Sequence, residues 1–465
     1  MTIAAIATPR GTGGIAVIRI SGGAAFSVGE KIFRHKTKKY RSFFDIPAST
    51  AVFGDITDAG KTIDSGVAVK FAAPASYTGD DTVEISCHGG IYIANAVLGA
   101  AVNAGARLAE PGEFTKTAYL NGKISLTGAE AVGRLIAAVG EAGARVASAQ
   151  SKGGLSKKIG AISDKIKDII SEVYVFIDYP GEDLSDMSPD DMLGKLLPIR
   201  EELETLKASY GIGKIVADGL DCAIIGKPNA GKSTLLNMLS REEVAIVHDT
   251  PGTTRDIVWS KVVINGIVLN LYDTAGIRAP GGEIERAGIE KARAKIEECA
   301  LIVGVFDAGE DYGEDDYSIL EILHREQENG KKIIAILNKC DVSPIVLGAN
   351  KTPFPSLTIS AKNNTVLNSD ISAYDAFAER LEAIYALGGC DLDSGEILTE
   401  ERQYFEICAA CGNVDSAVAA LSCGFTQDTA GLDLELAVKN LDMCDSKTVS
   451  EDIVDRIFKN FCIGK

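Results

Sequence analysis

One short run of residues constrains the fold of this chain more than any other feature: Gly226-Lys-Pro-Asn-Ala-Gly-Lys-Ser-Thr234. It lies between an apolar run typical of a strand, 222–225, and an apolar run typical of a helix, 234–239. Backbone N–H groups of such a glycine-rich turn, together with the positive end of the helix, can bind phosphates. Lys232 can then reach the β and γ oxygens of a nucleotide, and the Ser233 hydroxyl can ligate Mg²⁺. The run therefore predicts a P-loop nucleotide-binding domain.

Three further motifs follow, in the order used by guanine-nucleotide-binding domains: Asp273-Thr-Ala-Gly276, Asn338-Lys-Cys-Asp341 and Ser360-Ala-Lys362. The first two come directly after apolar runs, so each is expected at the carboxyl end of a strand. The Asp341 carboxylate can accept hydrogen bonds from N1–H and the 2-amino group of guanine, which adenine cannot offer. The motifs therefore predict GTP binding. The alternative is a glycine-rich turn with unrelated surface acids.

Length, composition and charge limit the class of protein. The chain has 465 residues, 46% of them apolar, which is enough for about three domains with hydrophobic cores. No run approaches the ~18 apolar residues of a membrane span, and residues 1–10 lack the features of a signal peptide, so we expect a cytoplasmic protein without membrane contact. The net charge of −18 disfavours general nucleic-acid binding. The basic run Lys31–Arg41 is either a local RNA-binding patch or an ordinary solvated face.

The ten cysteines are scattered without regular spacing, which is typical of reduced thiols. Cys408 and Cys411 lie in a stretch expected to be helical, and no second pair stands at the spacing of a zinc site. We therefore expect these two cysteines to be packing residues.

Hydrophobic periodicity indicates the type of each segment. The first 120 residues mix β-type runs with a helical run over 92–104, which predicts an α/β domain. Apolar residues step by three and four from Ile159 to Phe176 and from Met192 to Tyr210, so both stretches are expected to be amphipathic helices. Pro198 should kink or restart the second helix.

The chain after residue 388 is again helical in pattern, as in the series Ile453, Ile457 and Phe461. Neither helical stretch can cover its own apolar face, so we predict one helical domain that is split by an inserted nucleotide domain. The predicted segments are 1–120, 121–215, 216–385 and 386–465.

The nucleotide domain lacks one common catalytic group. Many small GTPases place a water-orienting glutamine directly after Asp-x-x-Gly, but here that position is Ile277, which can neither orient nor deprotonate water. The sequence assigns no cationic finger either, although Arg255 is available. The loop 249–256 offers Thr254 for Mg²⁺ and, near Asn229, a set of oxygens suited to an alkali cation. Such a cation can neutralise charge that develops on the phosphates.

Motifs at both ends of the chain resemble those of a known family. In order, these motifs are Thr2-Ile-Ala-Ala-Ile-Ala-Thr-Pro9, Gly13-Gly-Ile-Ala-Val-Ile-Arg-Ile-Ser-Gly22, Pro74-Ala-Ser-Tyr-Thr-Gly-Asp-Asp81, Cys87-His-Gly-Gly90, Ala109-Glu-Pro-Gly-Glu-Phe-Thr-Lys116 and Phe461-Cys-Ile-Gly-Lys465. With the GTPase motifs between them, the chain resembles the MnmE family, also called TrmE, over nearly its whole length.

The resemblance implies a potassium-activated GTPase that works on tRNA with the FAD protein MnmG. The two proteins would add an aminomethyl or carboxymethylaminomethyl group to carbon 5 of the wobble uridine. The one-carbon unit would come from 5,10-methylenetetrahydrofolate or 5-formyltetrahydrofolate, and the amine from glycine or ammonia. The implied fold is an N-terminal folate-binding-like α/β domain that builds a homodimer, and a helical domain split by an inserted Ras-like GTPase domain. With the partner, the dimer would form a heterotetramer or a larger complex.

The resemblance also implies catalytic and metal-binding residues. Glu285 would orient the attacking water through a second water. Cys462 matches the family's terminal cysteine, for which a catalytic role and a buried helix-end thiol are both open. Mg²⁺ would bind Ser233 and Thr254. The implied K⁺ ligands are Asn229, His248, Thr250 and Thr253.

Ligand-binding residues follow by the same motif match. The folate contacts would be Arg19, Glu84, Lys123 and Lys465, since Arg and Lys can pair with glutamyl carboxylates and Glu84 can accept two donors from the pterin. The expected GTP-binding residues are Asn229, Ala230, Gly231, Lys232, Ser233, Thr234, His248, Asp249, Thr250, Pro251, Gly252, Thr253, Thr254, Asp273, Thr274, Ala275, Gly276, Asn338, Lys339, Asp341, Ser360, Ala361 and Lys362.

The sequence departs from the family in two places. His248 stands where the family usually has a small hydroxyl residue, which leaves a backbone carbonyl as the potassium ligand. Residues 390–447 resemble the family poorly, and Thr399-Glu-Glu-Arg-Gln403 replaces a more basic segment. If the family resemblance is set aside, Cys462-Ile-Gly-Lys465 has the spacing of a C-terminal prenylation motif. A terminal lysine fits that motif poorly.

Two other functions are compatible with the GTPase motifs. One is a ribosome-assembly GTPase of the Era or Der type, which shares the phosphate-loop motif but lacks a folate-type domain and a Cys-Ile-Gly-Lys tail. The other is a nucleotide-controlled scaffold that catalyses no RNA chemistry. The motifs at the ends of the chain distinguish the first alternative from a tRNA-modifying enzyme, and a test of folate binding distinguishes the second.

Overall fold

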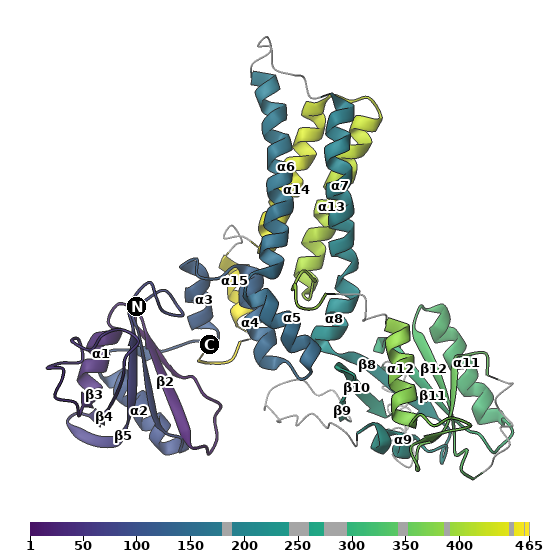
Figure 1. Cartoon of the computed structure of the whole chain (residues 1–465), viewed down its shortest axis with the longest axis horizontal. Helices are drawn as coiled ribbons and strands as arrows, with labels where there is room; N and C mark the ends of the chain where they lie inside the picture. Colours follow the sequence, from purple (N-terminus) through teal and green to yellow (C-terminus); the bar gives the residue numbers. More distant parts are fainter. Residues whose placement is uncertain are drawn as a thin grey trace, which may run out of the picture. The chain divides into compact units, whose positions relative to one another are not determined.

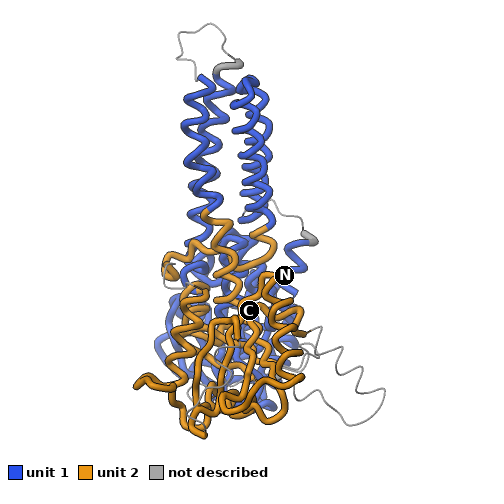
Figure 2. Tube along the Cα trace, turned by 90° about the vertical axis from the view of Figure 1, so that its right-hand side faces the viewer, with its two compact units in different colours: residues 1–136, 148–204, 405–465 blue, residues 137–147, 205–404 orange. Residues whose placement is uncertain are grey.

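The computed structural model describes residues 1–178, 188–240, 260–273, 295–342, 352–385, 391–445, 451–459 and 461–464. The chain forms two compact units, which Figure 2 distinguishes by colour. Unit 1 consists of residues 1–136, 148–204 and 405–465, and unit 2 of residues 137–147 and 205–404. Each unit is thus assembled from segments that are distant in the sequence, as expected when one domain is inserted into another.

Unit 1 contains a seven-stranded sheet, drawn in purple and blue in Figure 1. The sheet is antiparallel except where β1 pairs with β7. In spatial order, its strands are β3 (Phe33–His35), β4 (Ala51–Asp58), β5 (Lys61–Phe71), β6 (Thr82–His88), β2 (Ile15–Ser21), β1 (Ile3–Ile6) and β7 (Arg107–Leu108).

Two helices share the core of this sheet. Side chains alternate along β2, so Ile18 and Ile20 are fully buried while Arg19 faces the opposite side. The helices α1 (Ala25–Ile32) and α2 (Ile91–Asn103) contribute apolar side chains to the same buried cluster. The α/β domain and the helix predicted over 92–104 are therefore confirmed.

The last helix of the chain, α15 (Glu451–Phe458), packs on helices from the N-terminal third of the sequence. It contacts α3 (Glu113–Leu120), and its apolar side chains join a cluster that includes Leu126 and Ala129 of α4 (Leu126–Ala137). This packing carries the C-terminal segment to the N-terminal part of unit 1.

The predicted helix is confirmed over Glu451–Phe458, but the apolar series that indicated it faces the core only in part. Ile453 is 36% exposed, whereas Val454 and Phe458 are buried. Ile457 is partly buried against the same cluster, and Phe461 packs there from beyond the helix end. Neighbouring rows of apolar residues lie only about 100° apart around a helix, so spacing alone does not decide which row faces the core.

Four long helices, most of whose residues belong to unit 1, form a bundle (Figure 1). They are α6 (Gly154–Asp178), α7 (Pro189–Ala208), α13 (Glu401–Ser422) and α14 (Gln427–Asp445). Ion pairs link neighbouring helices, such as Lys195 with Glu172 and Arg200 with Asp415. The buried positions confirm both predicted amphipathic helices, and they include Ile159, Ile162, Ile166, Ile169, Val173, Met192, Leu196, Ile199, Leu203 and Leu206. The side chain of Phe176 lies outside the described residues.

Of the two outcomes predicted at Pro198, a kink or a restart, the restart is wrong, because α7 runs through this residue without interruption, and the kink stays a prediction. A proline inside a helix costs about 3 kcal/mol. Its neighbours Leu196 and Ile199 are buried in the bundle, and each such side chain contributes roughly 1.5–3 kcal/mol. Packing therefore outweighs the local cost of the proline.

Unit 2 contains a second seven-stranded sheet. Its inner strands are parallel, and the edge strands β9 and β14 are antiparallel to their neighbours. In spatial order, the strands are β14 (Thr365–Val366), β13 (Ser356–Ser360), β12 (Lys332–Asn338), β11 (Leu301–Asp307), β8 (Leu220–Gly226), β10 (Ile267–Asp273) and β9 (Ser260–Ile264). Parallel strands end at one edge of a sheet, so the residues after β8, β10 and β12 gather there.

Helices cover both faces of the second sheet. α9 (Lys232–Leu239) and α12 (Ala373–Tyr385) contribute to the core on one face, and α11 (Glu314–Glu328) to the core on the other. Two further helices, α5 (Glu141–Ser151) and α8 (Tyr210–Asp218), contribute Val146 and Val216 to a separate small cluster. The predicted fold class, two α/β parts and a split helical part, is confirmed.

The boundaries of the four predicted segments, at residues 120, 215 and 385, stay predictions. No helix in the described part of the chain is both long enough and apolar enough to cross a membrane.

Candidate functional site

The loop between β8 and α9 has the backbone shape of a phosphate-binding turn. Gly231 has φ +98°, in the left-handed region, and a Cβ there would overlap Nδ2 of Asn338. Asn229 is also left-handed, with φ +63°. Only glycine fits position 231, because the amide of Asn338 occupies the place that a side chain would take there.

The side chain of Lys232, the first residue of α9, folds back into the phosphate-binding loop that precedes it. Its side chain is buried, and Nζ donates to the carbonyl oxygens of Gly226 at 2.7 Å and Lys227 at 2.8 Å. The ammonium is thereby held at the mouth of the turn, where it can pair with phosphate oxygens. Ser233 is exposed in the first turn of α9.

Asn338 joins two of the predicted motifs. Its side chain is 2% exposed, and Nδ2 donates to the carbonyl oxygen of Ala230 at 3.0 Å. Its Oδ1 accepts from the backbone N–H of Ala361 at 3.0 Å. One buried amide therefore fixes the phosphate loop against the loop after β13, a strand whose last residue, Ser360, is fully buried.

Two further motif residues differ in how they are held. Lys339 has φ +69°, and its Nζ pairs with Oδ2 of Asp307 at 2.7 Å. Asp341 is exposed, as is Lys362 in the neighbouring loop. An exposed carboxylate next to a fixed lysine leaves Asp341 accessible to a nucleotide base.

Sequence reasoning missed a second tie on the phosphate loop. Nζ of Lys227 pairs with Oδ2 of Asp316 and Oε2 of Glu310, both at 2.9 Å. Burial lowers the pKa of Lys227, but the bonds to these two carboxylates outweigh it and the pKa lies above its ordinary value. Oδ2 of Asp316 also accepts from the backbone N–H of Gly313 at the start of α11, so the loop is tied to that helix. The acidic run Glu314-Asp-Asp316 is the sequence feature that could have indicated a partner for Lys227.

Several predicted site residues lie outside the described part of the chain. Asp273 ends β10, as expected, but its side chain is not among those described. The others are His248, Asp249, Thr250, Pro251, Gly252, Thr253, Thr254, Thr274, Ala275, Gly276, Glu285 and Lys465, together with Arg255 and Ile277.

In unit 1, Arg19 and Glu84 are cross-strand neighbours on the sheet face opposite the helices. Nε of Arg19 pairs with Oε1 of Glu84 at 2.8 Å. The guanidinium lies 5.3 Å from the ring centroid of Tyr77 and 5.6 Å from that of Phe114. Nη1 of Arg19 also donates to the carbonyl oxygen of Gly464 at 3.4 Å. The structure thus brings together two of the predicted folate residues and the C-terminal segment.

Lys123, the third predicted folate residue, contacts the same loop as this pair. Its Nζ donates to the carbonyl oxygen of Pro74 at 2.9 Å, three residues before Tyr77. Burial raises the pKa of Tyr77, although Thr115 and Arg19 lower it, so the phenol stays neutral at neutral pH. Tyr77 and Phe114 lie in two of the motifs that carry the family resemblance, 74–81 and 109–116, but the sequence analysis gave neither residue a role.

The structure decides one alternative for Cys462. α15 ends at Phe458, and Cys462 is exposed beyond it, so the buried helix-end thiol is wrong. Of the other predicted thiols, Cys411 is buried and Cys408 half-buried on α13.

Part of the basic run at 31–41 makes contacts within unit 1. Lys31 donates to the carbonyl oxygen of Ala104 at 2.9 Å, and Lys36 pairs with Asp55 at 2.6 Å. The RNA-binding patch stays a prediction.

A phosphate-binding turn between β8 and α9, tied by Asn338 to the loop after β13, defines the class: unit 2 holds a P-loop nucleotide-binding domain of the GTPase type. Two family models match the chain: "GTP-binding protein TrmE N-terminus" over residues 2–123 and "MnmE helical domain" over residues 126–462. The chain belongs to the MnmE family of tRNA modification GTPases, and the expected resemblance is confirmed.

Relatives match over their whole length. The chain is 36% identical to a tRNA modification GTPase MnmE of Acetivibrio thermocellus over 469 residues, which covers 100% of this chain and 99% of the relative. It is 37% identical to one of Alkaliphilus oremlandii over 466 residues, with the same coverage. Because both ends of the chain match, the Era or Der alternative is wrong.

Solved structures match part of the chain. Era of Aquifex aeolicus bound to GDP and AlF4⁻ is 25% identical and covers 42% of this chain and 66% of its own, with a TM-score of 0.26.

Proposed function

We propose that this GTPase is activated by K⁺ and, with an FAD-dependent MnmG-type partner, modifies carbon 5 of the tRNA wobble uridine. The modification would use a one-carbon unit of tetrahydrofolate. The observation that carries the proposal is the pairing, in one chain of this family, of a phosphate-binding loop with a second polar site where Arg19, Glu84 and the C-terminal segment meet. Since tRNA is the proposed substrate, the proposed compartment is the cytoplasm.

The GTP site fits the proposal by its shape and its chemistry. Gly231 lets the loop pass close to the amide of Asn338, and the ammonium of Lys232 stands beside this turn, where it would pair with phosphate oxygens. Ser233 and Thr254 would hold Mg²⁺, and Asn229, His248, Thr250 and Thr253 would hold K⁺, all through oxygen ligands that hard cations prefer. Bound cations would neutralise charge on the phosphates.

The chain's own side chains would perform the other steps. Lys232 binds phosphate oxygens, and Asp341 accepts hydrogen bonds from guanine. Glu285 holds the attacking water through a second water, which replaces the glutamine that Ile277 excludes.

The second site fits a folate by its charges and its rings. Arg19, Lys123 and Lys465 would pair with carboxylates, and Glu84 would accept hydrogen bonds from the pterin. The ring of Tyr77 beside the guanidinium offers an apolar wall for a flat ligand. A bound tetrahydrofolate would supply the one-carbon unit.

An exposed apolar patch supports the proposed homodimer. Phe53 of β4 and Val67 of β5 are register partners, 52% and 37% exposed, on the sheet face that also carries Arg19. Ile15 on the same face is 67% exposed. Such a patch is typical of a protein interface, and a second copy of this chain is the proposed partner.

GTP turnover in KCl and in NaCl at equal ionic strength tests the potassium site. Turnover is expected to be several-fold faster in KCl, because sodium has a smaller radius than potassium and should fit poorly in a potassium site. Rubidium, which is close to potassium in size, serves as the matched control and should also support turnover. Equal rates in sodium and potassium would contradict the proposal.

A further inference from the structure

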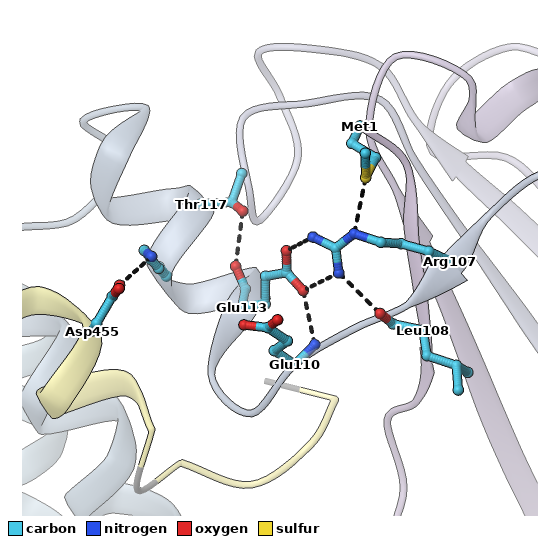
Figure 3. A network of polar contacts seen from close by, with 8 residues as sticks. Met1, Arg107, Leu108, Glu110, Glu113, Thr117 and Asp455 are labelled. Carbon is cyan, nitrogen blue, oxygen red and sulfur yellow. Dashed lines mark hydrogen bonds and ion pairs between the residues drawn. The ribbon is translucent and has the colours of Figure 1, made fainter. Parts of the chain in front are cut away.

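A turn of unit 1 holds a fixed shape next to the C-terminal helix; we call residues 109–116 the clasp. Its Glu113 accepts hydrogen bonds from Arg107 on both carboxylate oxygens, at 2.8 Å from Nη1 on one of them (Figure 3). The same carboxylate accepts from the backbone N–H of Glu110 at 2.8 Å. Nε of Arg107 contacts the sulfur of Met1 at 3.0 Å. The clasp is therefore anchored to β7 and to the first residue of the chain.

The clasp contacts the chain on both sides of the end of α15. Gly112 has φ +67°, and a Cβ there would come within 2.5 Å of the carbonyl oxygen of Phe458 and 3.0 Å of the Cβ of Phe461. Its N–H points to the carbonyl oxygen of Cys462 at 3.5 Å. Lys116 pairs with Asp455 of α15, as Figure 3 shows. Position 112 is thus a close backbone approach that only glycine permits.

The C-terminal segment, the residues that follow α15, makes a second close contact at Gly464, two residues after Cys462. Gly464 is buried with φ +101°, and a Cβ there would overlap the carbonyl oxygen of Ile6 and lie 2.9 Å from Cα of Ala7. Its own carbonyl oxygen accepts from Arg19. The C-terminal segment therefore runs from the clasp to the Arg19–Glu84 pair and forms part of that site.

The packing around the clasp is incomplete. A pocket of about 740 Å³ has residues 110–120, from the clasp and α3, on one side and the last turns of α15 on the other. Its lining includes Pro111 and Leu120 on one side and Arg456 and Lys459 on the other. The contacts at Gly112 and Lys116 add to the apolar packing of α15 on α3 and α4 in deciding where the C-terminal segment lies.

We infer that the clasp is a positioning device: Gly112 and the Lys116–Asp455 pair hold the C-terminal segment against Arg19, and this completes the site for a folate-type ligand bearing carboxylates. The inference rests on the proposed function for the identity of the ligand. It adds positioning residues that neither bind the ligand nor lie in the GTPase domain.

The first test measures where the segment is held, without any ligand. A spin label on Cys462, in a background with Cys390 and Cys423 changed to Ser, reports the mobility of the segment. Gly112→Ala is expected to raise the mobile fraction about tenfold, because the left-handed φ and the overlap with Phe458 must both be relieved. Gly160→Ala, where a Cβ on α6 meets nothing within 4 Å, is the matched control and should leave the spectrum unchanged.

The second test measures ligand binding. Calorimetry with 5-formyltetrahydrofolate should show about tenfold weaker binding for Gly112→Ala, while GTP affinity stays at the wild-type value. If the wild-type protein binds no folate, the proposed function fails, and the spin label alone still decides whether the clasp holds the segment. Unchanged mobility, or loosened mobility with undiminished folate affinity, would overturn the inference.

A charge exchange keeps the test decisive if Gly112→Ala does not fold. Lys116→Asp and Asp455→Lys each place like charges together, so each is expected to weaken folate binding about twofold, as exposed pairs do. The double variant restores opposite charges and should recover wild-type affinity. A merely structural role predicts no such recovery in folate affinity, and its absence would count against the clasp.

Discussion

Gly231→Ala tests the geometry of the phosphate loop most sharply. The substitution adds one methyl group at φ +98°, directly against Nδ2 of Asn338. Asn338 cannot move freely, because its amide bridges Ala230 and Ala361. The variant must therefore strain the backbone, break the bridge, or do both.

The cost can be worked out from these contacts. A non-glycine residue in the left-handed region costs roughly 1–2 kcal/mol. Displacing Asn338 removes two hydrogen bonds, each with a net contribution of about 0.5–1.5 kcal/mol. The sum is about 2–5 kcal/mol, so GTP affinity should fall by at least about 30-fold.

Equilibrium binding of a fluorescent GTP analogue, with thermal unfolding in parallel, measures this effect. Gly211→Ala is the matched control, because Gly211 lies inside α8 of the same unit and a Cβ there meets nothing within 4 Å. That control should bind GTP normally and gain up to about 1 kcal/mol of stability. A Gly231→Ala protein that binds GTP within about twofold of the wild type would refute the reasoning.

Two other predictions concern unit 2. Asp341→Asn should weaken GTP binding at least about tenfold and improve binding of xanthosine triphosphate, which presents an acceptor at position 2; equal GTP affinity in both proteins would refute the base assignment. Burial raises the pKa of Glu326, but its bonds to Lys331 and Arg325 outweigh this and hold the pKa below 4.5. Glu326→Gln should therefore cost about 1–3 kcal/mol of unfolding free energy at pH 7. This difference should shrink as the pH falls below 4.5 through the lowered pKa, and denaturant unfolding with an equal difference at pH 7 and pH 3.5 would contradict it.

Local patterns predicted the elements of the fold well, because their causes are local. The strand before Gly226 and the helix after Lys232 follow from apolar runs on either side of a glycine-rich turn. The long helices α6 and α7 follow from apolar residues spaced by three and four. A restart of the helix at Pro198 was wrongly expected, because the burial of its neighbours in the bundle is a tertiary effect that no local pattern contains.

The candidate sites were only partly predictable for a related reason. Motifs indicated that Gly231 and Asn338 belong to one site, but not that the amide of Asn338 would bridge two loops. The tie between Lys227 and Asp316 joins residues 89 positions apart and has no spacing rule. Likewise, the contact of Arg19 with Gly464 spans 445 positions and depends on how α15 packs.

The coupling of GTP hydrolysis to tRNA modification is the central claim of the proposed function. Mass spectrometry of wobble uridines, after reconstitution with the FAD partner, tetrahydrofolate, glycine, potassium and GTP, measures it directly. Glu285→Ala should keep GTP affinity but lose turnover, since Ile277 offers no substitute for orienting water. We predict that modified uridine accumulates with the wild-type protein and not with Glu285→Ala. Equal accumulation with the hydrolysis-deficient protein would contradict the coupling and favour a nucleotide-controlled scaffold.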